Sequence, residues 1–173
     1  MGLVRVFFVW LMLAMPVSAQ QSGPPVLIID SERVFFETTY GRRITDELAA
    51  QAATLQAEND EIVARLTQEE RSLTLRRPEM KLEEFRAEAE AFDTKVQEVR
   101  RVRDAKNVDL QVANAEARAQ FEERVQGIVA NIMLERGAAL VLEQRNVVLS
   151  VRAANITDDA IARIDRELGD GAP

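Results

Sequence analysis

The sequence contains no cysteine and no histidine. Without these residue types the chain has no disulfide bond, no thiol nucleophile and no serine–histidine triad, and most zinc sites are excluded. Glycine is absent between Arg42 and Gln126, so this long middle part cannot form a glycine-rich phosphate loop. Carboxylates are plentiful, but pairs such as Glu83 and Glu84 lie in a segment predicted to be a solvated helix. We therefore expect no enzyme activity, no metal and no cofactor.

Basic residues are fewer than acidic ones, 22 against 29, which gives a formal net charge of −7. An acidic chain is a poor nucleic-acid binder, because contacts to phosphate supply most of that affinity. The charge is also unevenly distributed. Residues 46–70 contain seven acidic side chains and one basic, whereas residues 95–106 contain five basic and two acidic. Opposite charges on neighbouring helices would favour one alignment of these two segments.

The first 19 residues have the order of a secretory signal peptide. Arg5 precedes an apolar run from Val6 to Met15, and small residues lead to Ala19. The alternative is a retained membrane anchor, but the run is shorter than the roughly 20 residues that span a bilayer. We expect cleavage after Ala19 and export of the mature chain.

The middle of the chain is rich in the helix formers Ala, Glu, Gln, Arg and Leu. Its apolar residues recur at alternating spacings of four and three, which is typical of a coiled-coil seam. The first seam consists of Ile44, Leu48, Ala52, Leu55, Ile62, Leu66 and Leu73, with Asn59 and Glu69 as polar exceptions. The second begins with Phe85, Ala89, Phe92, Val96 and Val99 and continues less regularly to Ile132.

Pro78 lies where the first seam ends and the second begins. Proline breaks a helix interior but is accepted in a first helical turn. We therefore predict a tight reversal at Arg76 and Arg77, with Pro78 starting the return helix. The result is an antiparallel helical hairpin over residues 42–136, with its tip near residues 76–80.

The two arms of this hairpin have unequal lengths. The return arm has more residues than the outgoing arm, so at 1.5 Å per residue one end would project. We expect the outgoing helix to begin earlier, around residues 31–36, and the return helix to run on toward Gly127 and Gly137.

Short aliphatic runs near both ends of the chain predict strands. Val26–Ile29 is one run, and residues 138–142 and 147–151 are two more, joined by four polar residues that suit a hairpin. Together, residues 20–41 and 137–173 would form a small sheet. Because so small a sheet is marginal alone and leaves free edges, we expect sister copies to cover it.

The last segment, NITDDAIARIDREL, is typical of a short amphipathic helix. Thr157 is the predicted N-cap, and acidic residues follow in the first turn. Ile161, Ile164 and Leu168 are spaced for one apolar face. Residues 169–173 are expected to be a loose tail.

The mature chain resembles the Skp (OmpH) family of periplasmic chaperones. The resemblance rests on the order of four segments, which are VLIIDSERVF, the helical hairpin, ALVLEQRNVVLSV and the start of the last helix, NITDDAIARI. The resemblance covers residue 26 to about residue 168. It implies a mainly α fold with a small β body, in which three copies join their strands into a central barrel and three helical arms surround a cavity. It also implies a periplasmic protein that holds unfolded outer-membrane β-barrel proteins without ATP.

Two groups of site residues follow from the resemblance. Candidate client-binding residues on the arms are Phe85, Phe92, Val102, Val108, Val112, Arg76, Arg77, Lys81 and Arg86. Candidate residues of the trimer body are Val26, Leu27, Ile28, Ile29, Leu140, Val141, Leu142, Val147, Val148 and Leu149. The aromatic residues suit the coiled-coil seam better than a client-binding surface, and the basic residues equally suit a solvated helix end.

The acidic net charge departs from the family pattern, so we expect at most weak contact with membrane surfaces, through local basic patches. A different class of function also fits the arm. A structural coiled-coil adaptor or spacer of the cell envelope would use the same helices to bind folded partners.

Overall fold

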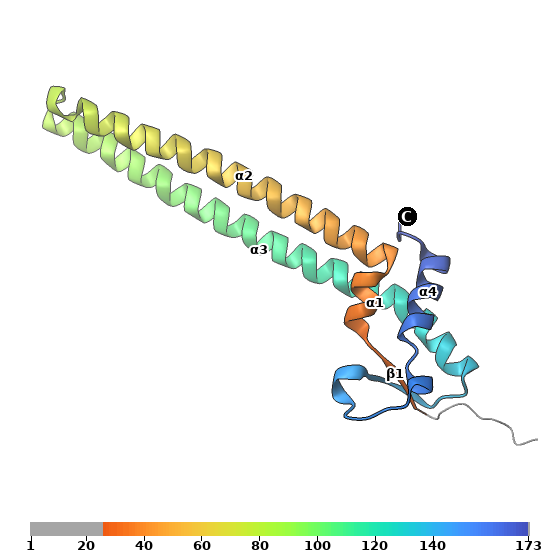
Figure 1. The fold of residues 1–173 in the computed structure, drawn as a ribbon. Coiled ribbons are helices and arrows are strands. Elements are labelled where there is room, and N and C mark those ends of the chain that lie inside the picture. The colour runs from red at the N-terminus through yellow and green to blue at the C-terminus, as the bar shows by residue number, and fades with distance from the viewer. Residues whose placement is uncertain (1–25, 173) are drawn as a thin grey trace, which may run out of the picture.

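The computed structural model describes residues 26–172, so the predicted signal peptide lies outside the described residues. A long rod of two antiparallel helices projects from a small body that contains both ends of the described chain (Figure 1). The predicted fold class, mainly α with a small β body, is confirmed. Over the described residues, no helix combines the length and apolarity needed to cross a membrane.

The rod, called the arm below, consists of α2 (Thr39–Arg76) and α3 (Leu82–Glu135). The reversal between them is longer than predicted. Pro78 lies inside a 3₁₀ turn, Arg77–Glu79, rather than in the first turn of the return helix. Met80 and Lys81 then have extended backbone, with ψ of 147° and 149°, so α3 begins only at Leu82.

The outgoing helix is preceded by a separate short helix, α1 (Ser31–Glu37). Thr38 breaks the helix between α1 and α2, with extended φ and ψ of −73° and 151°. Its buried side chain accepts a hydrogen bond from the Gly41 backbone N–H at 3.2 Å. A Cβ at residue 41 would overlap the Phe35 carbonyl, so only glycine allows this close corner. The outgoing helix was predicted to begin around residues 31–36. This region instead forms a separate helix, α1, joined to α2 by a corner at Thr38.

The return helix continues past the end of α2 into the body. With 54 residues against 38, α3 is about 24 Å longer than α2 at 1.5 Å per residue. The buried residues of α3, which are Phe121, Val125, Ile128 and Ile132, lie in its last four turns, beside the first turn of α2 and beyond it. One helix thus belongs to both the arm and the body.

The sheet of the body has two parallel strands, β1 (Val26–Ile29) and β2 (Leu140–Glu143), in the register Val26 to Leu140. The prediction of a hairpin over residues 138–151 is wrong. The polar residues Gln144–Asn146 form a 3₁₀ turn, and residues 147–151 are not a strand. The reason is that β2 pairs with the distant β1, while residues 147–151 have no partner strand among residues 26–172.

The closing helix, α4 (Thr157–Leu168), lies where it was predicted, but its cap is shifted by one residue. Ile156 is the N-cap, and the Thr157 hydroxyl instead accepts a hydrogen bond from the Asp30 backbone N–H at 3.0 Å. Ile156, Ala160 and Ile164 are completely buried. α4 is therefore fixed to the body by its apolar face and to the end of β1 by Thr157.

The core is concentrated at the arm root, where α1, α2, α3 and α4 meet. The Phe121 ring lies 5.0 Å from the Phe35 ring and 5.2 Å from the Tyr40 ring, measured between centroids. Full burial of a side chain of this size stabilises the folded state by about 1.5–3 kcal/mol. By contrast, Leu73 is the only buried residue between residues 45 and 120. Most of the arm is thus held by a half-buried seam.

Candidate functional surfaces

Ion pairs across the arm fix how α2 and α3 are aligned. Glu58 pairs with Lys106 at 2.5 Å, and Glu69 pairs with Lys95. These pairs join the acidic segment 46–70 to the basic segment 95–106, as predicted from the charge pattern. The other basic residues of that segment do not all take part, since Arg101 binds Glu98 of its own helix.

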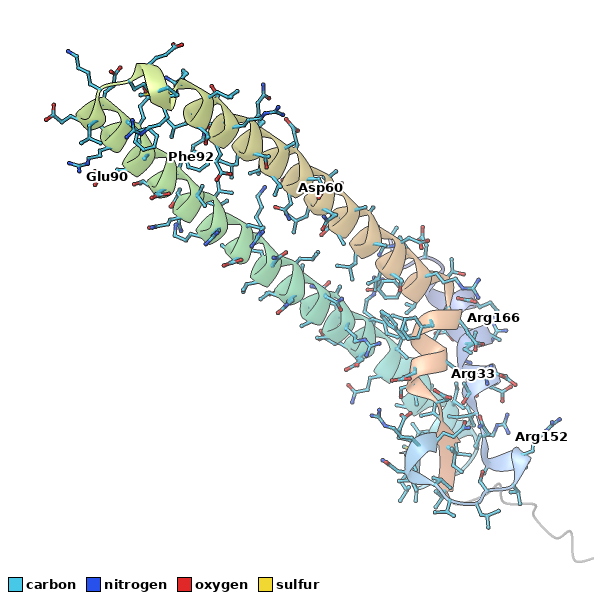
Figure 2. The ribbon with its side chains drawn as sticks, turned by 60° about the vertical axis from the view of Figure 1, so that its left-hand side comes forward. Arg33, Asp60, Glu90, Phe92, Arg152 and Arg166 are labelled. Atoms are coloured by element: carbon cyan, nitrogen blue, oxygen red, sulfur yellow. The ribbon has the colours of Figure 1, made fainter. Side chains whose placement is uncertain are left out.

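The two aromatic residues predicted to bind a client are half-buried in the arm seam. Phe92 lies between the arm helices near the tip (Figure 2). The Phe85 ring is covered by the Arg77 guanidinium, 4.5 Å from the ring centroid. Both rings therefore contribute to the packing of the tip, which limits their availability to a partner.

The four basic residues at the tip have different surroundings. Arg76 donates two hydrogen bonds to Glu88, the shorter at 2.6 Å, and this lowers the pKa of the Glu88 carboxyl below its usual range. Arg77 stacks on Phe85 as described above. Lys81 and Arg86 are exposed. All four residues are exposed, so each contributes positive charge to the tip, and that of Arg76 is offset by Glu88.

An apolar stripe follows the exposed side of α3. Val108 and Val112, one turn apart, are 56% and 49% exposed, and Val102 beside them is 39% exposed. Alanines continue the stripe at spacings of three and four, which places them on the same helix face. The "α3 stripe" comprises Ala105, Val108, Val112, Ala115 and Ala119.

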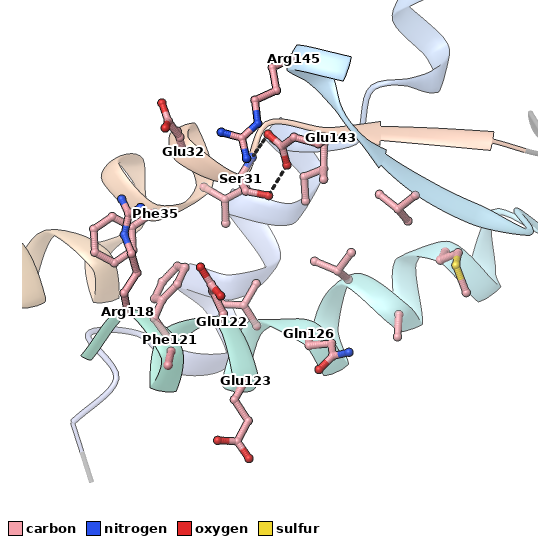
Figure 3. A pocket seen from close by; sticks show the side chains of 18 residues that line it. Ser31, Glu32, Phe35, Arg118, Phe121, Glu122, Glu123, Gln126, Glu143 and Arg145 are labelled. Atoms are coloured by element: carbon pink, nitrogen blue, oxygen red, sulfur yellow. Dashed lines mark hydrogen bonds between the residues drawn. The ribbon is translucent and has the colours of Figure 1, made fainter. Parts of the chain in front are cut away.

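The α3 stripe leads into a groove of about 900 Å³ at the arm root (Figure 3). Ala119 belongs to both, and the α3 wall of the groove continues with Gln126, Ala130 and Met133 at similar spacings. The other walls come from α1 and β2 and include Val34, Phe35 and Val141. We call this the root groove.

Two polar residues at the rim of the root groove, Ser31 and Glu143, are paired with each other. Ser31 donates from its hydroxyl and its backbone N–H to Glu143, at 2.6 and 3.2 Å (Figure 3). The Arg118 guanidinium lies 4.6 Å from the Phe35 ring centroid. The rest of the lining mixes apolar side chains, among them Val34, Val129 and Met133, with charged side chains, namely Glu32, Glu122, Glu123 and Arg145. Across residues 26–172 no group of three or more acidic side chains is placed to hold a metal ion.

Sequence reasoning missed the root groove because its walls come from three elements far apart in the chain. The heptad-like spacing of the α3 stripe does continue from residue 119 to residue 133, on the face that lines the groove. That continuation was the one sequence pattern that could have indicated an apolar face at this end of α3. Nothing in the sequence indicated that α1 and β2 would stand opposite this face.

The segment 147–151, called the body loop, exposes three large apolar side chains. Val148, Leu149 and Val151 are 98%, 90% and 67% exposed, and Leu140 and Leu142 of β2 are about 40% exposed beside them. Other residues predicted for the trimer body have different positions: Leu27, Ile28 and Ile29 are buried within the chain itself, and Val26, Val141 and Val147 are half-buried.

A long two-helix arm on a small parallel-stranded body, with a groove at the junction, places the chain in a class of proteins with a tentacle-like arm. The family comparison makes this class specific. Residues 25–164 match the profile of the OmpH-like outer membrane proteins, and the chain belongs to that family.

The fold is also similar to a solved structure, that of a protein from Caulobacter crescentus assigned as an OmpH-like outer membrane chaperone. The TM-score is 0.79, with 17% sequence identity over 84% of this chain and 86% of that chain. No curated protein matches the sequence significantly.

Proposed function

We propose that this protein is a periplasmic chaperone of the OmpH family that holds unfolded outer-membrane β-barrel proteins without ATP. It would act as a homotrimer whose arms surround a cavity. The observation that carries the proposal is the exposed apolar path formed by the α3 stripe and the root groove, on a chain whose body also exposes an apolar loop.

Self-association is supported by the body loop and the small sheet. A sheet of two four-residue strands is marginal alone, and β2 pairs with β1 on one side only. Leu149 and Val148 would be costly to leave in water, and neither is covered by the residues that the structure describes. Sister copies that pack these residues together would complete the body.

Client binding is supported by the chemistry of the α3 stripe. Strands of outer-membrane barrels carry apolar side chains at alternate positions, and they pair edge to edge when unfolded. Small, evenly spaced side chains such as Ala105, Val108 and Val112 offer many weak contacts without a fixed shape. A client held by such contacts can be released without an energy source.

The direct test dilutes an unfolded outer-membrane barrel protein from urea into buffer with and without the purified chain. We expect a trimeric molar mass by light scattering, and suppression of client aggregation at about one trimer per client. A monomeric mass would remove the cavity. Unchanged aggregation in the presence of a trimer would refute the holding function while leaving the fold intact.

The alternative function, an envelope adaptor that binds folded partners, predicts a different result in the same assay. An adaptor would bind one folded protein saturably and would leave aggregation of the unfolded barrel unchanged. The exposed, aliphatic character of the α3 stripe favours the chaperone, since it offers few polar groups to specify a folded partner.

A further inference from the structure

The segment after α4, residues 169–172, is bound to the arm root rather than loose. Arg43 of α2 donates from Nε to the Asp170 carbonyl at 2.6 Å. Arg124 of α3 donates from Nη1 to the Gly171 carbonyl at 2.7 Å. Two adjacent carbonyls of the segment thus connect the two helices of the arm. The expected loose tail is therefore wrong for these residues.

Gly171 fits this place because it has no side chain. Its φ of 71° lies in the left-handed region, and a Cβ at this position would overlap the Tyr40 ring. Tyr40 is only 4% exposed. The guanidinium groups of Arg43 and Arg124 lie 5.5 and 5.1 Å from the centroid of the same ring. The backbone of the segment thus completes the cover of Tyr40.

The first turn of α2 depends on these contacts more than α3 does. α3 runs unbroken from the arm into the body, whereas α2 begins only after the helix break at Thr38. The backbone N–H of Thr39 donates to the Asp165 side chain of α4 at 2.7 Å. The Asp170 carbonyl contacts Arg43, and Gly171 contacts Tyr40. Residues 165–171 thus make three contacts with the first two turns of α2.

The contacts of residues 169–172 are weaker than those of α4 itself. α4 is anchored by Ile156, Ala160 and Ile164, all completely buried. Residues 169–172 contribute only glycine, aspartate and alanine, so hydrogen bonds and backbone packing hold them. Each such hydrogen bond contributes little net stability. This segment can therefore open while α4 remains docked, because local opening begins where apolar burial is least.

We propose that residues 169–172 form a clasp that holds α2 against α3 at the arm root. Closed, the clasp buries Tyr40 and keeps the base of the arm together. Open, it frees the first turns of α2 and widens the arm base, without unfolding the body. The clasp concerns how the arm is held, so it goes beyond the proposed chaperone function and does not depend on it.

Tyr40 provides the test, because it is the only tyrosine in the chain. The only tryptophan, Trp10, lies in the predicted signal peptide, so Tyr40 is the sole strong fluorophore of the mature chain that begins at Gln20. In this mature chain, Gly171→Val should raise acrylamide quenching of Tyr40 by about twofold or more and speed amide exchange in residues 39–44 by about tenfold. The control is Gly137→Ala, which introduces backbone strain at a φ of 63° with no atom near the new Cβ, and it should leave both values unchanged.

A deletion of residues 169–173 removes the clasp without introducing bulk and should give the same result as Gly171→Val. Spin labels on cysteines placed at Ala50 and Asn114, both exposed, should then report a broader distance distribution at the arm base. Far-UV circular dichroism should show unchanged helix content. Unchanged quenching in both variants would overturn the proposal, and so would Tyr40 exposure that appears only together with loss of helix.

Discussion

Glu58 of α2 and Lys106 of α3 form an ion pair at 2.5 Å although 48 residues separate them in the chain. Two further cross-arm pairs follow toward the tip, namely Glu69 with Lys95 and Arg76 with Glu88. Successive pairs are eleven and then seven residues apart on both helices. These spacings are close to whole numbers of helical turns, so all three pairs lie along one side of the arm in a single antiparallel register.

A charge swap tests this register. Glu58→Lys should lower the free energy of unfolding by about 0.2–1 kcal/mol, because the pair is about half exposed and solvent weakens it. The double variant with Lys106→Glu should recover most of that loss in urea unfolding followed by circular dichroism. Glu61→Lys is the matched control, since Glu61 lies near Arg65 of its own helix. If the change in unfolding free energy of the double variant equalled the sum of the two single-variant changes, the two residues would not be coupled.

The pH dependence of the tip follows from Glu88. Hydrogen bonding to Arg76 lowers the pKa of Glu88 below its ordinary value of 4.5. A lowered pKa in the folded state means that the stabilisation is present above the ordinary value and is lost as pH falls through the folded-state value. We expect the tip to loosen below about pH 4.5.

NMR titration of the Glu88 side chain measures this effect directly. In Arg76→Gln the pKa of Glu88 should return toward its ordinary value, and amide exchange at residues 73–92 should depend less on pH. The pKa of Glu135 is lowered by Arg163 in the body, so its titration in the same variant serves as an internal reference. An unchanged Glu88 pKa in Arg76→Gln would contradict the assigned cause.

The arm was predictable from the sequence because its information is local and repeated. The four-and-three spacing from Ile44 to Leu73 and the opposite charges of residues 46–70 and 95–106 specify two helices and their alignment. The helical reversal was correctly placed, but its length was not. The two extended residues before Leu82 depend on how the ends of two helices meet, which no local pattern encodes.

The body was less predictable because its information is distant in the chain. Residues 138–142 and 147–151 have equal strand propensity, but β2 pairs with β1, which precedes it by more than 100 residues. The second run, residues 147–151, pairs with no strand in the described part of the chain. In the same way, the root groove and the site of residues 169–172 are assembled from separate elements, so a pattern within any one of them could not reveal either.

The α3 stripe gives a prediction for the chaperone assay. Replacing Val108 and Val112 with serine removes apolar contact area from an exposed face, so the fold should change little in stability. We expect weaker suppression of client aggregation, by about threefold or more, from the loss of two buried apolar contacts in the complex. The measurement is light scattering of a diluted outer-membrane barrel protein against chaperone concentration.

Val63→Ser is the control for the α3 stripe, because Val63 is 53% exposed on the other arm helix. Its replacement should affect suppression less than the double change on α3. Equal effects of the two would show that any exposed valine contributes alike, and the α3 stripe would then have no special role in holding a client.

The body loop gives the prediction on which the trimer depends. Leu149 is 90% exposed within the chain, so Leu149→Asp should leave the fold of one copy intact. In a trimer the same position would be buried, and an unpaired carboxylate there costs several kcal/mol. We expect light scattering to report the mass of one chain for Leu149→Asp and of three for the control Val63→Asp on the arm, with the same helix content in both. A Leu149→Asp protein that kept the wild-type mass would place the contact between copies elsewhere on the body, because no interface that buries Leu149 could accept that charge.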